Sequence, residues 1–375
     1  MPLFIFWNFD PEIVNLPMLA PRWYGLLFAI AFYSGYLILR KVWLQEKLSE
    51  KSLDTLSWYV IIATLIGARL GHVLFYGPWW DVEIGGRIVQ EGYFSHPISI
   101  LNIREGGLAS HGAAIGILIA LWLYKRKTKL DRSFLWIVDR LVIVVAIGGF
   151  FVRFGNFTNS EIIGKPTTAS TGVIFAHNSM SRLDANLSEN NQGLIDYSLN
   201  KTGNTEVVDS VTYAVYNLDL KFNGAEEEFR EFILYGLTGV FNTSDPSYRH
   251  MSFNGFQEFE VQNSGSTLNA NIKVLALPRH PAQLYEAFSY LFLFFILFGI
   301  YRKYGTETPN GLLFGVFLTI MFTARFLIEF IKENQVAFED DLSLNMGQNL
   351  SIPFVLIGVG LIVYSLKKRS AVIDQ

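Results

Sequence analysis

The sequence predicts an all-α polytopic membrane protein with seven transmembrane helices and one small β-rich insertion. Of its 375 residues, 51% are hydrophobic and only 17% are charged, whereas soluble domains carry about 25% charged residues. The chain contains seven long apolar stretches, and a bilayer is crossed by about 20 such residues. Basic clusters recur at every second connection between the stretches, as expected when a chain crosses a membrane repeatedly.

The seven apolar stretches lie near residues 23–39, 56–76, 111–124, 133–152, 283–301, 311–331 and 350–366. The third is short and contains glycine, so it is the weakest candidate for a crossing. The basic clusters "RKVWLQEKLSEK", "YKRKTKLDR", "YRKYGTE" and "LKKRS" follow alternate stretches. Cytoplasmic loops carry an excess of Lys and Arg. Seven crossings therefore place the amino terminus outside and the carboxyl terminus in the cytoplasm.

Residues 168–277 do not fit the transmembrane pattern, because they are polar and rich in Asn, Ser and Glu. The alternating runs "TEVVDSVTYAVYNLDLKF" and "NANIKVLALP" predict half-buried strands. We expect a β-rich domain on the outer face, inserted between a core of residues 1–167 with spans one to four and a core of residues 278–375 with spans five to seven. The first residues lack the features of a signal peptide, so we expect a short retained arm.

The composition excludes several kinds of chemistry. The chain has no cysteine, which rules out disulfides, thiolate metal sites and a cysteine nucleophile. Its net charge of −3 gives no reason to expect nucleic acid as a partner. It contains neither an HExxH metal motif nor a GxSxG nucleophile motif. We therefore expect no metal and no cofactor.

Polar and ionisable residues gather at the outer ends of the predicted spans. Such residues are costly in lipid and usually line a cavity. Each has an ordinary structural explanation when taken alone: Arg325 and Glu329 could form a helix ion pair, and Arg69 could extend its guanidinium to the interface. Their joint placement favours a polar cavity open to lipid and to the outer water. The residues are Tyr24, Arg69, His111, Arg153, His280, Gln283, Tyr285, Glu286, Arg325, Glu329 and Gln348.

These residue types suit the binding of a phospholipid headgroup. Arginine forms bidentate bonds to phosphate and stays charged in a low dielectric. The stretch "RFGNFTNSEIIGKPT", which begins at Arg153, adds asparagines, a glutamate and glycines. Glycines at 106, 107, 112, 155 and 164 would let backbone N–H groups approach an anion. We therefore expect catalysis by positioning, charge stabilisation and proton transfer.

Together these segments resemble the prolipoprotein diacylglyceryl transferase family. The matching motifs, in the family's order, are "RWYGL", "GARLGHVLFY", "EGGLASHGAAIG", "RFGNFTNSEIIGKPT", "RHPAQLYEA", "RFLIEF" and "MGQNLSIP". They touch all seven predicted spans. The chain departs from the usual pattern at Val152, Ser160 and Ala113, where the family has glycine, and at Met321, where a tyrosine is common.

The resemblance implies transfer of the diacylglyceryl group of phosphatidylglycerol to the lipobox cysteine thiol of a prolipoprotein, with formation of a thioether and release of glycerol phosphate. It implies a multi-pass protein of the bacterial inner membrane whose active site faces the periplasm, so the insertion would be periplasmic. The expected partners are phosphatidylglycerol, the precursor with its signal peptide, and membrane lipids.

The resemblance also implies roles for individual residues. Arg153 and Arg325 would bind the phosphate, and Tyr24 would hydrogen-bond near the headgroup or the thiol. His111 is the first candidate for thiol deprotonation or for organising the headgroup, although the identity of the base stays open. The headgroup pocket would comprise Arg153, Asn156, Asn159, Glu161, Gly164, Arg69 and Arg325. Supporting roles would fall to Glu329, His280, Gln283, Tyr285, Glu286 and Gln348.

Two other functional classes stay open at this point. A transporter or flippase also carries intramembrane charges, but it needs access from both faces and often shows internal repeats. This chain shows no repeat, and its polar residues cluster on one side. A receptor or assembly factor would use the insertion as its binding module, for which no individual residue argues.

Overall fold

The computed structural model describes residues 4–14, 20–84, 87–102, 107, 109–128, 130–188, 193–242, 250–255, 257–334 and 342–373. The chain divides into two compact units. The sheet-containing unit comprises residues 1–28, 151–288 and 324–350, and the helical unit comprises residues 29–150, 289–323 and 351–375. Each unit is described by itself.

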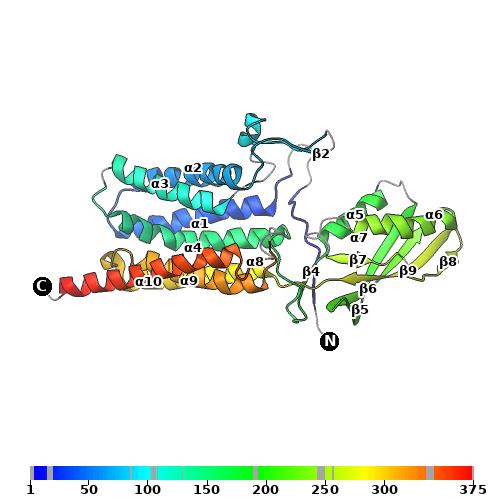
Figure 1. Cartoon of the computed structure of the whole chain (residues 1–375). Helices are drawn as coiled ribbons and strands as arrows, with labels where there is room; N and C mark the ends of the chain where they lie inside the picture. The colour runs from blue at the N-terminus through cyan, green and yellow to red at the C-terminus, as the bar shows by residue number, and fades with distance from the viewer. Residues whose placement is uncertain are drawn as a thin grey trace. The chain divides into compact units, whose positions relative to one another are not determined.

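In the described part of the chain, each of the seven apolar stretches lies in a long helix (Figure 1). Six of these helices are long and apolar enough to cross a membrane, and they make this a multi-pass membrane protein. The remaining one, α3, has 19 residues and carries three consecutive basic residues in its last turn, so its crossing stays a prediction. The helices are α1 (Trp23–Gln45), α2 (Glu50–Phe75), α3 (Ser110–Thr128), α4 (Phe134–Thr158), α8 (Ala282–Tyr304), α9 (Leu312–Ile328) and α10 (Met346–Ile373).

Within the helical unit, α2 and α3 lie side by side and pack through glycines (Figure 1). A Cβ atom on Gly112 of α3 would lie 2.3 Å from the carbonyl oxygen of Gly67 of α2. A Cβ atom on Gly71 would lie 2.7 Å from the Cα atom of Gly112. Small residues four apart allow such close helix contact in membranes. The motifs "GARLG" and "GAAIG" thus form the two faces of one helix contact.

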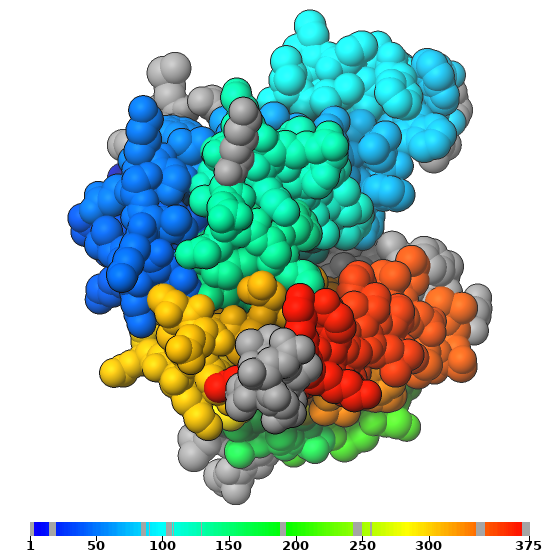
Figure 2. Space-filling view, turned by 90° about the vertical axis from the view of Figure 1, so that its left-hand side faces the viewer, coloured from blue at the N-terminus to red at the C-terminus, as the bar shows by residue number. Residues whose placement is uncertain are grey.

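A buried ionic cluster joins α4 to the end of α1 and to the start of α9. The Arg140 guanidinium of α4 contacts the Glu46 carboxylate, which follows α1, at 2.7 Å, and both side chains are almost fully buried. The neighbouring Asp139 accepts hydrogen bonds from the backbone N–H groups of Gly311 at 2.6 Å and Phe314 at 2.8 Å. These bonds satisfy donors that the start of α9 would leave unpaired. Figure 2 views this end of the helical unit, where blue, green, yellow and red segments reach the surface.

The sheet-containing unit holds an antiparallel sheet in the order β5-β6-β9-β7, with β8 also paired to β9. Alternate residues of β9 are buried against α5 (His177–Ser188) and the helical segment 226–241. The alternation of the sequence therefore does produce strands. A tight turn at Asp209 and Ser210, both with positive φ, joins β5 to β6. The strands are β5 (Leu194–Val208), β6 (Val211–Phe222), β7 (Met251–Phe253), β8 (Val261–Ser264) and β9 (Thr267–Ala276).

The amino-terminal arm is part of the same unit. Strand β1 (Ile5–Trp7) pairs in parallel with β4 (Val173–Phe175). Phe4 is 5% exposed and belongs to the hydrophobic core of the sheet. In the helical unit, a hairpin of β2 (Val82–Ile84) and β3 (Arg87–Gln90) and the 3₁₀ helix η1 (Pro97–Leu101) connect α2 to α3. Short 3₁₀ turns η5 (Gly305–Glu307) and η6 (Glu329–Ile331) follow α8 and α9.

Candidate active site

The stretch that begins at Arg153 closes α4 with a hydrogen-bonded cap. The N–H of Ser160 donates to the Phe157 carbonyl and the N–H of Glu161 donates to the Asn156 carbonyl, both at 3.1 Å. These are the two bonds of a Schellman motif. Ser160 has a φ of 54°, in the left-handed region that favours glycine. The family's usual glycine at this position therefore has a conformational reason.

The cap folds Glu161 back beside the last turn of α4. Its carboxylate accepts hydrogen bonds from the Asn156 amide at 2.9 Å and the Asn159 amide at 3.3 Å. The side-chain oxygen Oδ1 of Asn156 in turn accepts a bond from the Arg153 guanidinium at 3.3 Å. Gln283 of α8 donates to the Glu161 main-chain carbonyl at 2.7 Å. The polar residues of the stretch thus form one connected wall around Arg153.

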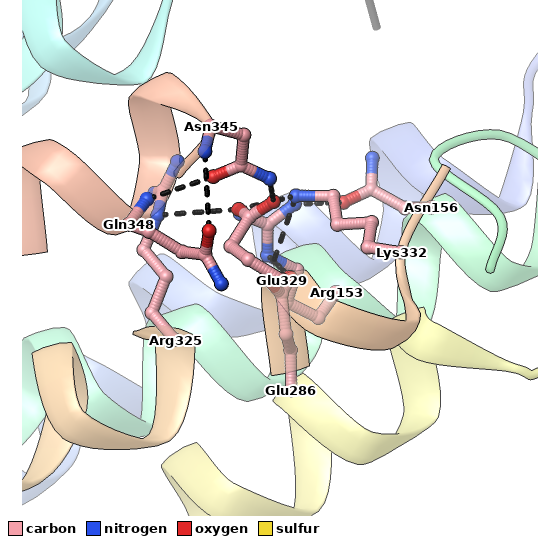
Figure 3. A network of polar contacts seen from close by, with 8 residues as sticks. All are labelled: Arg153, Asn156, Glu286, Arg325, Glu329, Lys332, Asn345 and Gln348. Atoms are coloured by element: carbon pink, nitrogen blue, oxygen red, sulfur yellow. Dashed lines mark hydrogen bonds and ion pairs between the residues drawn. The ribbon is translucent and has the colours of Figure 1, made fainter. Parts of the chain in front are cut away.

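A line of alternating charges continues from this wall. The Arg153 Nε atom lies 2.6 Å from Glu286 Oε2, and the Lys332 Nζ atom lies 3.7 Å from Glu286 Oε1. Lys332 Nζ also lies 3.0 Å from Glu329 Oε1, which is 3.6 Å from Arg325 Nε. We call these five residues the charge chain (Figure 3). It has a cation at each end, and its two carboxylates are almost fully buried.

The start of α10 supports the charge chain from one side. The Asn345 side chain accepts a bond from the Gln348 N–H at 2.8 Å, and the Gln348 side chain accepts one from the Asn345 N–H at 3.1 Å. This reciprocal pair is a capping box. The Asn345 amide also donates to Glu329 Oε2 at 3.1 Å. A Cβ atom on Gly347 would lie 2.5 Å from Glu329 Oε1, so the motif "NMGQ" combines a helix cap with room for Glu329.

Gly164 supports the charge chain through backbone packing. Its N–H donates to the His280 carbonyl at 3.0 Å, and a Cβ atom there would lie 2.5 Å from the same oxygen. Gly164 also forms a β-bridge with Lys332. We expected the Gly164 N–H to approach an anion. In this structure it is bonded to the His280 carbonyl instead, and the close backbone contact holds the segment around Lys332. His280 lies 3.3 Å from the Tyr285 hydroxyl, and burial lowers the pKa of His280.

Tyr24, at the start of α1, belongs to the same unit as the charge chain. A Cβ atom on Gly155 would lie 2.8 Å from the Tyr24 ring, and the ring stacks on Phe28 with centroids 6.4 Å apart. A side chain at position 155 would therefore clash with the Tyr24 ring. This packing explains a second glycine of the stretch without an anion.

Arg69 and His111 belong to the helical unit. The Arg69 guanidinium donates to the carbonyls of Ser99 at 2.6 Å, Ile100 at 2.8 Å and Gly107 at 3.2 Å. Arg69 is only 7% exposed and ties η1 to α2. Binding a phosphate, as expected from the sequence, would require it to leave these carbonyls. Gly106, one of the glycines expected near an anion, lies outside the described residues.

His111 is the second residue of α3 and is exposed. Its ring lies 5.3 Å from that of Phe75 and 5.5 Å from that of Tyr76, centroid to centroid. The next residue, Gly112, packs directly against Gly67 and Gly71 of α2. The packing of α2 on α3 therefore determines where the histidine stands within this unit.

The comparison with known families shows which family the chain belongs to. The family model for prolipoprotein diacylglyceryl transferase matches residues 11–364. The chain belongs to the prolipoprotein diacylglyceryl transferase family. The resemblance of the motifs is thereby confirmed, and nothing in the match supports a transporter.

Members of the transferase family align with almost the whole chain. The enzyme named phosphatidylglycerol–prolipoprotein diacylglyceryl transferase of Tolumonas auensis is 34% identical over 366 residues, covering 98% of this chain and 99% of the relative. Its namesake in Porphyromonas gingivalis is 34% identical over 373 residues, covering 98% and 96%. That of Bacteroides fragilis is 31% identical over 374 residues, covering 98% of each. The insertion is therefore included in alignments with other members of the family.

Two residues of this candidate site were missed by sequence reasoning. Lys332 follows Arg325 and Glu329 at helical spacing, so a search for charges on one helix face would have found it. Asn345 stands three residues before Gln348, and Asn followed three residues later by Gln is a signal for a helix start. Both signals are local, and both lie just outside the motifs that carry the resemblance.

Proposed function

We propose that this protein transfers the diacylglyceryl group of phosphatidylglycerol to the cysteine thiol of a prolipoprotein lipobox. The cysteine sulfur attacks the carbon of the diacylated glycerol that is bonded to the phosphate oxygen. The carbon–oxygen bond breaks as the carbon–sulfur bond forms, and glycerol phosphate leaves with the bonding electron pair. The thiol proton passes to a base. The absence of cysteine from the chain fits this reaction, because the nucleophile arrives on the substrate.

The observation that carries this proposal is the charge chain in a member of this family. Arg153 and Arg325 stand at its two ends, where each has a carboxylate on one side. Guanidinium groups bind phosphate oxygens in bidentate fashion, and positive charge near the leaving group stabilises the charge that develops on it. We assign phosphate binding to these arginines and a positioning role to Glu286 and Glu329.

The remaining roles follow the family resemblance. Asn156, Asn159, Glu161 and Gly164 would shape the wall beside Arg153. Tyr24 would hydrogen-bond near the headgroup or the thiol, and His111 remains the first candidate for the base, since a neutral imidazole is a suitable proton acceptor near neutral pH. Arg69, which the resemblance places in the headgroup pocket, would act there by holding the loop before α3. The supporting set is His280, Gln283, Tyr285 and Gln348.

We further propose seven crossings, with the amino terminus in the periplasm and the carboxyl terminus in the cytoplasm of a bacterial inner membrane. The basic clusters at one end of the helical unit support this orientation. Residues 168–277 would then form a periplasmic domain between the cores of residues 1–167 and 278–375, and the substrates would meet near the periplasmic face.

The test uses the full chain, purified and reconstituted in vesicles of phosphatidylglycerol with a lipobox peptide. We expect the peptide to gain the mass of a diacylglyceryl group while glycerol phosphate is released. Arg153→Ala and His111→Ala should each lose roughly 100-fold or more in turnover. Arg230→Ala, which breaks an exposed ion pair on α6 (Glu226–Glu231), is the matched control and should retain full turnover. The proposal would be refuted if folded parent protein produced neither the mass gain of the peptide nor the release of glycerol phosphate.

A further inference from the structure

Lys332 is a buried cation between two buried carboxylates, and neither the motifs nor the family name assigns it a role. Its side chain is 5% exposed, and its ammonium lies 3.0 Å from Glu329 and 3.7 Å from Glu286. Each of these glutamates also holds one arginine of the charge chain. Figure 3 shows the ammonium between the two carboxylates. Lys332 is therefore the link that joins two arginine–glutamate pairs into one chain.

The charge count explains why such a link is useful. The charge chain contains three cations and two carboxylates. A phosphodiester adds one negative charge, so the complex with a lipid phosphate has three of each sign. Glu161 stands outside this count, because its side chain is exposed, so that solvent screens its charge, and its hydrogen bonds come from the neutral amides of Asn156 and Asn159. Without Lys332, two arginines would face two carboxylates and the phosphate, and a buried unpaired charge is strongly unfavourable.

The ion-pair distances indicate how phosphate would enter. The Arg325–Glu329 contact, at 3.6 Å, is looser than the contact of the same carboxylate with Lys332 at 3.0 Å. Arg325 is also the most exposed member of the charge chain, with 28% of its side chain accessible. It can therefore turn from Glu329 to a phosphate oxygen while Lys332 and the Asn345 amide keep the carboxylate satisfied.

We propose that Lys332 is a positioning residue for phosphatidylglycerol binding. It holds Glu329 when the headgroup phosphate arrives, so that Arg325 is released to bind the phosphate while Arg153 keeps its 2.6 Å contact with Glu286. This inference rests on the proposed function, because it takes the lipid phosphate as the ligand of the arginines.

The backbone around Lys332 is held independently of its ammonium, so the side chain can be changed without losing the segment. The main chain of Lys332 forms a β-bridge with Gly164. The Lys165 N–H donates to the Ile331 carbonyl at 2.8 Å, and the Lys165 ammonium donates to the Phe330 carbonyl at 3.1 Å. We therefore expect Lys332→Met to fold.

The test compares four forms of the full chain: the parent, Lys332→Met, Lys332→Arg, and the double variant Lys332→Met with Glu329→Gln. Phosphatidylglycerol binding is measured in detergent by native mass spectrometry, and the KM and kcat for the same lipid are measured with the lipobox peptide. Binding does not require turnover, so an inactive parent would count against the proposed function without deciding the role of Lys332.

We expect Lys332→Met to raise both the dissociation constant and the KM for phosphatidylglycerol by about tenfold or more, with a smaller change in kcat. Lys332→Arg should keep affinity near that of the parent. The double variant removes one cation and one carboxylate, so it should bind the lipid several-fold more tightly than Lys332→Met. Parent-like binding by Lys332→Met, or a double variant that binds no better than Lys332→Met, would overturn the inference.

Discussion

At the scale of single residues, the cap of α4 holds a serine in a conformation that suits glycine. Ser160 has a φ of 54°, and a left-handed backbone costs a residue with a Cβ atom about 1–2 kcal/mol. We expect Ser160→Gly to raise the free energy of unfolding by about 1 kcal/mol, measured by thermal unfolding in detergent. Ser198→Gly, in the exposed middle of β5, should lower it instead. A Ser160→Gly protein that melts no later than the parent would contradict this account of the cap.

A buried histidine makes the sheet-containing unit sensitive to acid. His250 is 2% exposed, and burial, helped by the nearby Arg279 cation, lowers the pKa of His250 to about 3. The pKa of an unfolded histidine is about 6.5. Between these values the unfolded chain binds a proton that the folded chain does not, so the free energy of unfolding falls as the pH drops through this window.

The expected loss from His250 between pH 7 and pH 5 is about 2 kcal/mol. It can be measured as faster hydrogen exchange in β7 and β9 at pH 5, after correction for the intrinsic effect of pH. His250→Phe keeps a ring beside Phe175 and should remove most of this dependence. His177→Gln, at the start of α5, is the control and should retain it. Equal pH dependence in His250→Phe and the parent would show that another group is responsible.

At the scale of elements, the contact of α2 with α3 depends on glycines that leave no room for a side chain. The Cβ atom of Gly112→Ala would lie 2.3 Å from the Gly67 carbonyl oxygen, so the helices must separate. We expect a loss of about 1–3 kcal/mol in stability and a large loss of turnover, because His111 moves with α3. Gly148→Ala on α4 is the matched control, since a Cβ atom there meets nothing within 4 Å. Equal turnover in the two variants would contradict the role of this contact.

Asn345, at the start of α10, both caps the helix and donates a hydrogen bond to Glu329, and one substitution can separate these two roles. Asn345→Asp keeps an oxygen that accepts the Gln348 N–H, so the cap persists. It replaces the amide that donates to Glu329 at 3.1 Å with a second carboxylate. We expect a several-fold higher KM for phosphatidylglycerol, because Lys332 must then balance an additional negative charge. Asn345→Ser, which retains both a cap acceptor and a donor, should change the KM less; the reverse order would argue that the cap alone matters.

At the scale of the whole molecule, the number of crossings is six or seven depending on whether α3 crosses the membrane. The chain has no cysteine, so a single introduced thiol can be labelled without background. Lys127→Cys, in the last turn of α3, should resist a membrane-impermeant maleimide in cells with a permeabilised outer membrane, whereas Ser198→Cys on the sheet should react. Labelling of Lys127→Cys under these conditions would mean that α3 does not cross.

Much of the architecture could be predicted because its causes are local. Apolar length and basic flanks indicate helices such as α4 and α8, and alternation indicates strands such as β9. The interactions of Arg153 and Arg325 could be predicted only in part, since the spacing of Arg325 and Glu329 revealed a pair but Glu286 lies far from Arg153 in sequence. The glycines at 155 and 164 were expected near an anion. Instead, Gly155 packs against the Tyr24 ring and Gly164 packs against the His280 backbone. Such contacts depend on segments brought together by the fold, which no local pattern records.

The pairing of β1 with β4 has a consequence for the order of assembly. Ile5 meets Val173 across a parallel bridge, and four long helices lie between them in the sequence. Closing so large a loop is entropically unfavourable before the intervening helices are ordered. The arm must therefore wait, after its own synthesis, until those helices and β4 have been made. The arm is made before α1 to α4 but pairs after them, and Phe4 reaches the sheet core only at that late stage.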